Sequence, residues 1–106
     1  MFGFLKSQNI NKGVEEFRAT NGAALIDVRS KQEYRSGHIP GSINIEGATI
    51  QNASKRILDK KTPLFVYCLS GGRSSSAVRA LESMGFTSVK NIGGINSYTG
   101  PIAKGN

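Results

Sequence analysis

The sequence has the length and composition of one globular domain. It contains 106 residues, of which 38% are hydrophobic and 20% charged, so it can bury a core without disulfides. Its single cysteine excludes an internal disulfide, and no apolar stretch is long enough to cross a bilayer. The first residues lack the long apolar segment and small-residue cleavage site of a signal peptide. We therefore expect a single domain over residues 1–106, with a core from about 10 to 104, in the cytoplasm.

The chain is basic, and its basic residues are scattered. Fourteen Lys and Arg residues stand against seven Asp and Glu residues, which gives a formal net charge of +7. No basic run is longer than two residues, and few aromatic residues lie between the basic ones. We therefore predict a solvated basic surface and neither nucleic-acid nor membrane binding. The same charge would attract small oxyanions to a site.

The first third of the chain predicts a helix, a strand and a short helix. Asn11 is placed to cap a helix that ends near 21–22, and the apolar run that follows predicts a buried strand over 23–28. Ser30 and Glu33 have the spacing of a capping box, so a short helix should run to about Ser36.

The rest of the chain continues this alternation. The expected elements are a turn at 38–41, a strand at 42–45, a helix at 53–58, a strand at 64–67, a helix capped by Ser74 and ended by Gly85, a strand at 89–92 and a short terminal helix. Strands that alternate with helices favour an α/β fold with a largely parallel sheet.

Cys68 lies where an apolar strand gives way to a glycine-containing loop over 69–73. In an open parallel sheet, ligands bind beyond the carboxyl ends of the strands. Two glycines let the loop curl with its N–H groups pointing inward, and the helix that follows adds its own N-terminal donors. These features predict a thiolate of low pKa that attacks or holds an anionic group.

The segment Cys68–Ser74 resembles the C-x-x-G-x-R-S active-site loop of the rhodanese-type sulfurtransferases. Other segments resemble motifs of that family in the same order: Asp27-Val28-Arg29, Glu33-Tyr34, the G-H-I-P-G run from Gly37 to Asn44, and Gly93-Gly94. The resemblance implies a rhodanese-like α/β fold, with an open, mostly parallel five-stranded sheet and helices on both faces.

The resemblance also implies an activity. Cys68 would accept sulfane sulfur from thiosulfate or a persulfide donor and pass it to a thiophilic acceptor. The substrate-binding residues would be those of the loop: Leu69, Ser70, Gly71, Gly72, Arg73 and Ser74. We expect a monomer without metal or cofactor, whose partners are a small sulfur donor and acceptor or a thiol or persulfide of another protein.

The sequence departs from the family pattern at two places. Tyr98 stands where the family commonly has tryptophan after its G-G, which is a conservative exchange of a packing aromatic residue. Ser70 stands where some thiosulfate-using members have a cation, and Leu69 before it is apolar. The second departure weakens the case for thiosulfate as the natural donor and leaves persulfide chemistry unaffected.

Loop length separates the leading hypothesis from its alternatives. Four residues lie between Cys68 and Arg73, whereas the related phosphatases and arsenate reductases have five, which leaves room for a tetrahedral oxyanion. A shorter ring suits one added sulfur atom. The second hypothesis is a sulfur-carrier module that delivers the Cys68 persulfide to a partner protein, and the third is a phosphatase or arsenate reductase.

The remaining polar residues have structural interpretations. We expect Asp27, Arg29 and Glu33 to form a supporting network at a strand end, with Arg29 in reach of Glu33. His38 belongs to a turn and is expected to be architectural. For Arg73 two roles stay open, binding an anionic donor or tying the loop down.

Overall fold

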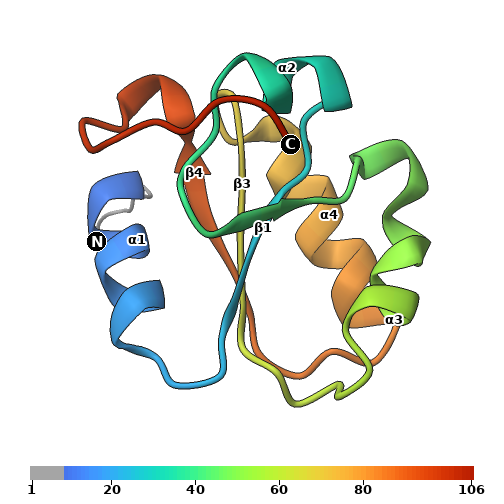
Figure 1. The fold of residues 1–106 in the computed structure, drawn as a ribbon. Coiled ribbons are helices and arrows are strands. Elements are labelled where there is room, and N and C mark those ends of the chain that lie inside the picture. The colour runs from blue at the N-terminus through green and yellow to red at the C-terminus, as the bar shows by residue number, and fades with distance from the viewer. Residues whose placement is uncertain (1–8) are drawn as a thin grey trace.

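A computed structural model describes residues 9–106 as a parallel sheet between two layers of helices (Figure 1). The sheet has the strand order β2-β1-β3-β4, and every neighbouring pair is parallel. The strands are β1 (Ala24–Asp27), β2 (Ser42–Asn44), β3 (Leu64–Cys68) and β4 (Val89–Gly94). This arrangement confirms the predicted α/β fold with a parallel sheet.

The expected fifth strand is absent from the described residues. The C-terminal segment returns beside the chain before β2, but only His38 and Ala103 form a bridge there, with both N–H···O distances at 2.9 Å. Pro101 has no N–H group to donate, so the segment has little capacity to extend the ladder. The prediction of five strands was therefore wrong by one.

One face of the sheet packs against α4 (Gly72–Ser83), the 3₁₀ helix η1 (Gly47–Asn52) and the short helix α3 (Ala53–Arg56). The core on this face includes Ile26, Val66, Ala77, Leu81 and Phe86. The predicted helix over 53–58 is thus shorter than expected, and the 3₁₀ turns before it were not predicted.

The opposite face packs against α1 (Ile10–Ala19). A Cβ added to Gly13 would lie 2.4 Å from Cβ of Ile92, so this helix approaches β4 closely. Asn9 caps the helix by accepting the N–H groups of Asn11 and Lys12. The predicted cap, Asn11, lies inside the first turn and accepts the N–H of Thr99 instead.

The helix α2 (Lys31–Ser36) lies at the carboxyl edge of the sheet, near the C-terminal segment (Figure 1). Its capping box is confirmed: Ser30 Oγ accepts the N–H of Glu33, and the Glu33 carboxylate accepts the N–H of Ser30. A final 3₁₀ helix, η2 (Ile95–Ser97), follows β4. No helix within residues 9–106 is long and apolar enough to cross a membrane.

The two-residue alternation of β3 determines where the cysteine lies. Leu64, Val66 and Cys68 belong to the core on the α4 face, whereas Phe65 and Tyr67 belong to the core on the α1 face. The sulfur therefore lies at the carboxyl end of a central strand, on the same face as the helix that follows it.

Candidate active site

The Cys68 sulfur receives hydrogen bonds from two backbone N–H groups. The N–H of Gly71 lies 3.0 Å from Sγ and the N–H of Ser74 lies 3.3 Å from it, and Oγ of Ser74 is 3.4 Å away. Only 1% of the residue's surface is exposed. The loop thus wraps around a buried sulfur, as the glycine-containing sequence predicted.

The helix after the loop begins earlier than the sequence suggested. Its N-cap is Gly71, whose φ of 110° is a left-handed conformation that favours glycine. The prediction of Ser74 as the cap was wrong, because Ser74 is the third residue of α4. The first N–H groups of a helix have no partner within it, which leaves the N–H of Ser74 free for the sulfur.

These contacts shift the ionisation of Cys68. Burial alone would raise its pKa, because a buried charge loses its hydration. The Ser74 side chain and the N–H groups of Ser74, Gly71 and Ser70 stabilise the thiolate enough to outweigh burial, and they lower the pKa of the thiol below its usual value. The site therefore favours a thiolate, the nucleophilic form of cysteine.

Gly94 forms the floor of the loop. A Cβ at this position would lie 2.2 Å from the carbonyl oxygen of Leu69 and 2.5 Å from Cα of Ser70. The N–H of Asn96 also donates to the Leu69 carbonyl at 3.1 Å. The end of β4 thus fixes the backbone of the loop, which gives the Gly93-Gly94 pair a physical role.

Asn91 is a residue of this site that the sequence analysis did not single out. Its Oδ1 accepts the Ser74 hydroxyl at 2.8 Å and the N–H of Gly93 at 2.9 Å, and its Nδ2 donates to the carbonyl of Gly71 at 3.3 Å. One side chain therefore joins β4 to both ends of the turn around the sulfur. The available signal was an asparagine inside a strand, where this residue type is uncommon.

Arg73 pairs with Glu33 and not with a ligand group of the loop. Its two terminal nitrogens lie 2.8 and 3.0 Å from the carboxylate oxygens, which makes a bidentate pair between α4 and α2. The hydrogen bond from Arg73 is the largest cause that lowers the pKa of Glu33 to about 2. Arg29 makes no hydrogen bond or ion pair with Glu33 within the described residues, because Arg29 turns toward Asp27. The charges of Arg29 and Glu33 still lie close enough to interact.

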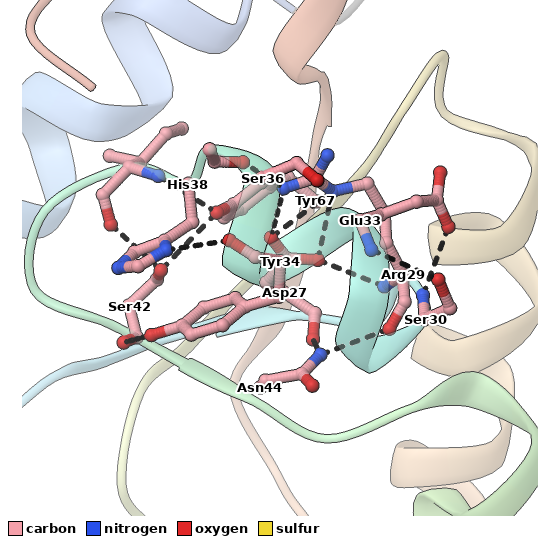
Figure 2. Close-up of polar contacts among 12 residues, drawn as sticks. Asp27, Arg29, Ser30, Glu33, Tyr34, Ser36, His38, Ser42, Asn44 and Tyr67 are labelled. Atoms are coloured by element: carbon pink, nitrogen blue, oxygen red, sulfur yellow. Dashed lines mark hydrogen bonds and ion pairs between the residues drawn. The ribbon is translucent and has the colours of Figure 1, made fainter. Parts of the chain in front are cut away.

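Asp27 and Arg29 form a buried ion pair beside the site (Figure 2). Nη2 of Arg29 lies 2.7 Å from the Asp27 carboxylate and 2.6 Å from the carbonyl of Gly37. Asn44 donates to the carbonyls of both Asp27 and Arg29. The guanidinium and the carboxylate thus bind each other, and neighbouring backbone carbonyls accept from Arg29 and Asn44, which is the network expected at this strand end.

His38 and Tyr67 hold the segment between α2 and β2. The His38 ring stacks on Tyr34 with a centroid distance of 3.7 Å, and its Nδ1 lies 2.8 Å from the Tyr34 carbonyl (Figure 2). The hydroxyl of Tyr67 accepts the N–H of Ile39 and donates to Ser42. These contacts favour the architectural role predicted for His38.

A cavity of about 500 Å³ lies between η1 and α4, beside the loop. Its lining is mainly apolar, and its polar lining residues include Arg73, Glu46, Ser30 and Ser76. The wall residues Val28 and Ala77 also belong to the core cluster that contains Cys68. Such a cavity has the size and character of small-molecule sites.

Within residues 9–106, no group of three or more His, Cys, Asp or Glu side chains converges as a metal site would require. The chemistry that the described side chains support is nucleophilic attack by one thiolate. Neither of the residues that sequence reasoning could have taken for acid-base groups, Asp27 and His38, makes a hydrogen bond to Cys68.

The family model of the rhodanese-like domain matches residues 8–100. Among curated relatives, the thiosulfate sulfurtransferase PspE of Escherichia coli is 36% identical over 81 residues, which cover 76% of this chain and 78% of PspE. The thiosulfate sulfurtransferase GlpE of Pseudomonas savastanoi is 40% identical over 74 residues, covering 69% and 68%. In the Ogataea parapolymorpha adenylyltransferase and sulfurtransferase uba4, 34% identical over 90 residues, the match spans 23% of that longer protein.

Solved structures show the same architecture. A rhodanese from Escherichia coli, determined with anions, has a TM-score of 0.73 at 34% identity, and the match covers 78% of this chain and 99% of that one. A rhodanese-like domain protein from Staphylococcus aureus has a TM-score of 0.79 at 23% identity, covering 96% and 100%, which supports the fold alone.

Proposed function

Because this chain belongs to the rhodanese-like domain family and is a sulfurtransferase, we propose that it carries sulfane sulfur as a persulfide of Cys68. The observation that carries the proposal is the pair of N–H donors from Gly71 and Ser74 on a buried sulfur. The loop directs two backbone N–H dipoles at a single atom, and these stabilise the thiolate that sulfur transfer requires. A cysteine that is already ionised needs no general base, and the loop holds none.

In the first step, the Cys68 thiolate attacks the outer sulfur of the donor. A bond forms between Sγ and that sulfur, while the bond from the outer sulfur to the rest of the donor breaks. The leaving group, sulfite or a thiolate, departs with the bonding electron pair. The Gly71 and Ser74 N–H groups stabilise the attacking thiolate beforehand, so no proton has to be removed in this step.

In the second step, a nucleophilic acceptor attacks the outer sulfur of the persulfide. The S–S bond breaks and Cys68 leaves as a thiolate, which the same donors stabilise again. Cyanide, a small thiol or a cysteine of a partner protein could each serve as the acceptor. The complete cycle is a two-step, ping-pong exchange without net oxidation.

The residues around the loop favour an organic persulfide over thiosulfate as the donor. Ser70 provides no cation, and the exposed Leu69 is apolar. The Arg73 guanidinium is bound by Glu33, so its charge is partly neutralised. The adjoining apolar cavity of about 500 Å³ provides room for the organic part of a donor or acceptor.

The second candidate is a carrier that discharges to one partner protein. Leu69, next to the cysteine, is 45% exposed and would contact an acceptor protein that reached the sulfur. A phosphatase is disfavoured, since four residues separate Cys68 from Arg73 and the arginine is held by Glu33.

A reducing compartment such as the cytoplasm suits a free thiol, and we propose that location.

The test is the intact mass of the reduced protein after incubation with thiosulfate or a cysteine persulfide. We expect the wild-type chain to gain one sulfur and Cys68→Ser to gain none. Ser54→Ala, a serine outside the loop, is the matched control and should load like the wild type. No gain with either donor, together with hydrolysis of a phosphoester, would overturn the proposal.

Discharge separates the enzyme from the carrier. After excess donor is removed, cyanide should convert the loaded chain to the unmodified mass and release thiocyanate if the chain turns over small acceptors. A loaded chain that resists cyanide and small thiols would instead favour the carrier.

A further inference from the structure

The Ser74 hydroxyl has one proton and three neighbours that could receive it. Its Oγ lies 2.8 Å from Oδ1 of Asn91, 3.0 Å from the carbonyl of Gly71 and 3.4 Å from Sγ of Cys68. Asn91 is the closest acceptor. The direction of this proton therefore depends on whether the sulfur is a thiol or a thiolate.

With a neutral thiol, the Cys68 thiol, the Ser74 hydroxyl and the Asn91 side chain can form two successive hydrogen bonds. The S–H of Cys68 donates to Oγ of Ser74, and the Ser74 hydroxyl donates to Asn91. When the thiol ionises, the S–H donor is lost and a lone pair of Ser74 faces the negative sulfur. The hydroxyl then has to turn away from Asn91 to donate to the thiolate, and it loses its shortest hydrogen bond.

We infer that Asn91 is a positioning residue that sets the pKa of Cys68 by competing with it for the Ser74 proton. The inference rests on the proposed function, because it concerns the same sulfur. Asn91 makes no contact with Sγ and acts through Ser74. Its Oδ1 keeps the N–H of Gly93 in either state, so the competition involves only the hydroxyl.

The charged groups around the sulfur do not duplicate this effect. On α4, Arg73 is near enough for its charge to interact with Cys68, but its guanidinium is paired with Glu33 of α2. At the end of β1, Asp27 and Arg29 neutralise each other. Lys90, next to Asn91 in β4, is exposed and paired with Glu16. None of these groups exchanges a proton with Ser74, so its hydroxyl is the adjustable donor at the sulfur.

The test is the pH dependence of the thiolate absorbance in the ultraviolet, without any sulfur donor. Ser74→Ala should raise the pKa of Cys68 by about one, since it removes a hydrogen bond to a charged group. Asn91→Ala should lower it by a similar amount, because the hydroxyl is released to the sulfur. In the double variant the Asn91→Ala effect should disappear.

A control variant, a second test variant and a folding measurement accompany this test. Asn44→Ala removes a comparable strand asparagine that also holds backbone carbonyls at this edge, and should leave the Cys68 pKa unchanged. Asn91→Asp is the second variant, for use if Asn91→Ala fails to fold. It keeps the acceptor and adds a negative charge, so it should raise the pKa of Cys68. Circular dichroism reports folding for each variant.

A purely structural role for Asn91 predicts different results. If Asn91→Ala raises the pKa, or shifts it equally with and without the Ser74 hydroxyl, the inference is overturned. Loading with sulfur is measured separately by mass. A chain that shows the pKa pattern, takes up no sulfur from either donor and hydrolyses a phosphoester would refute the proposed function and leave this inference standing.

Discussion

Two neighbouring strands of the sheet end in polar clusters that do opposite things. At the end of β1, Asp27 and Arg29 are buried and satisfy each other at 2.7 Å, with Gly37 and Asn44 completing their hydrogen bonds. At the end of β3, two N–H groups converge on the single sulfur of Cys68. Both clusters follow apolar strands in parallel register.

The difference lies in which cluster holds a group that can still change its charge or its covalent bonds. Asp27 and Arg29 neutralise each other, so a substitution of either residue lowers the free energy of unfolding. Neither side chain is left free to take part in a reaction. The sulfur cluster holds donors around an atom that can change its charge and its covalent state. The comparison therefore predicts that variants at β1 affect folding and variants at β3 affect chemistry.

The largest effect is expected from Asp27→Ala. This change leaves the buried Arg29 guanidinium without its carboxylate, which costs about 3–5 kcal/mol of unfolding free energy. Denaturant unfolding measures the loss, and Asp59→Ala at an exposed turn is the control. If the remaining folded protein had a changed Cys68 pKa, the separation of the two clusters would be wrong.

The next effect is expected from Gly94→Ala. The new Cβ would meet the Leu69 carbonyl at 2.2 Å, so the loop backbone has to move. A displacement of this kind lowers the rate of sulfur loading about 100-fold. Intact-mass measurements on samples quenched at successive times give the loading rate.

Gly13→Ala is the matched control for that change. Its Cβ would be equally crowded, 2.4 Å from Ile92, but at the contact between α1 and β4. It should lower stability and leave the loading rate of the folded fraction near that of the wild type. Equal slowing by both variants would show that crowding anywhere in the sheet damages the site.

A smaller effect should appear in the pH dependence of alkylation. The pKa of Cys68 is lowered in the fold, so the thiolate is present at any pH above that lowered value and disappears as the pH falls through it. The alkylation rate of the native chain with a small haloacetamide should therefore level off at a lower pH than that of the urea-unfolded chain, whose thiol has a pKa of about 8.5. Coincident profiles would contradict the donor arrangement.

The smallest effect is expected from Glu33→Gln, which breaks the link between α2 and α4. The side chains of Arg73 and Glu33 are 48% and 32% exposed, so the pair contributes less than about 1 kcal/mol to stability. The pKa of Glu33 is lowered from 4.5 to about 2. Its contribution is therefore present above pH 4.5 and is lost as the pH falls toward 2.

Denaturant titrations of the wild type and Glu33→Gln across that pH range measure the contribution. The two proteins should differ at neutral pH and converge in acid. Glu16→Gln removes the other exposed pair, with Lys90, and is the control. Only Glu33→Gln should also alter sulfur loading, since Glu33 holds Arg73, the last residue of the loop, whereas Glu16 holds Lys90 in β4.

Local features of the site could be predicted from the sequence, and distant pairings could not. The position of Cys68, the inward N–H groups and the Ser30–Glu33 capping box depend on residues within a few positions of one another. The Glu33–Arg73 pair joins residues 40 positions apart, and the Ser74–Asn91 contact joins residues 17 apart. Which of two nearby cations reaches Glu33 depends on side-chain directions that only packing decides.

The fold shows the same limit. The alternation of apolar and polar runs predicted the four parallel strands. Whether the last residues add a strand depends on how the C-terminal segment meets His38, and there Pro101 follows Gly100 just before the single bridge. Helix starts were displaced by two or three residues, at Asn9 and Gly71, because several side chains in each stretch could cap.

The burial of Cys68 also sets which reagents can reach it. With 1% of the residue exposed, two copies of the chain cannot bring their sulfur atoms within the S–S bond length of about 2 Å unless the loop opens. The fold thereby protects its only thiol from oxidative dimerisation.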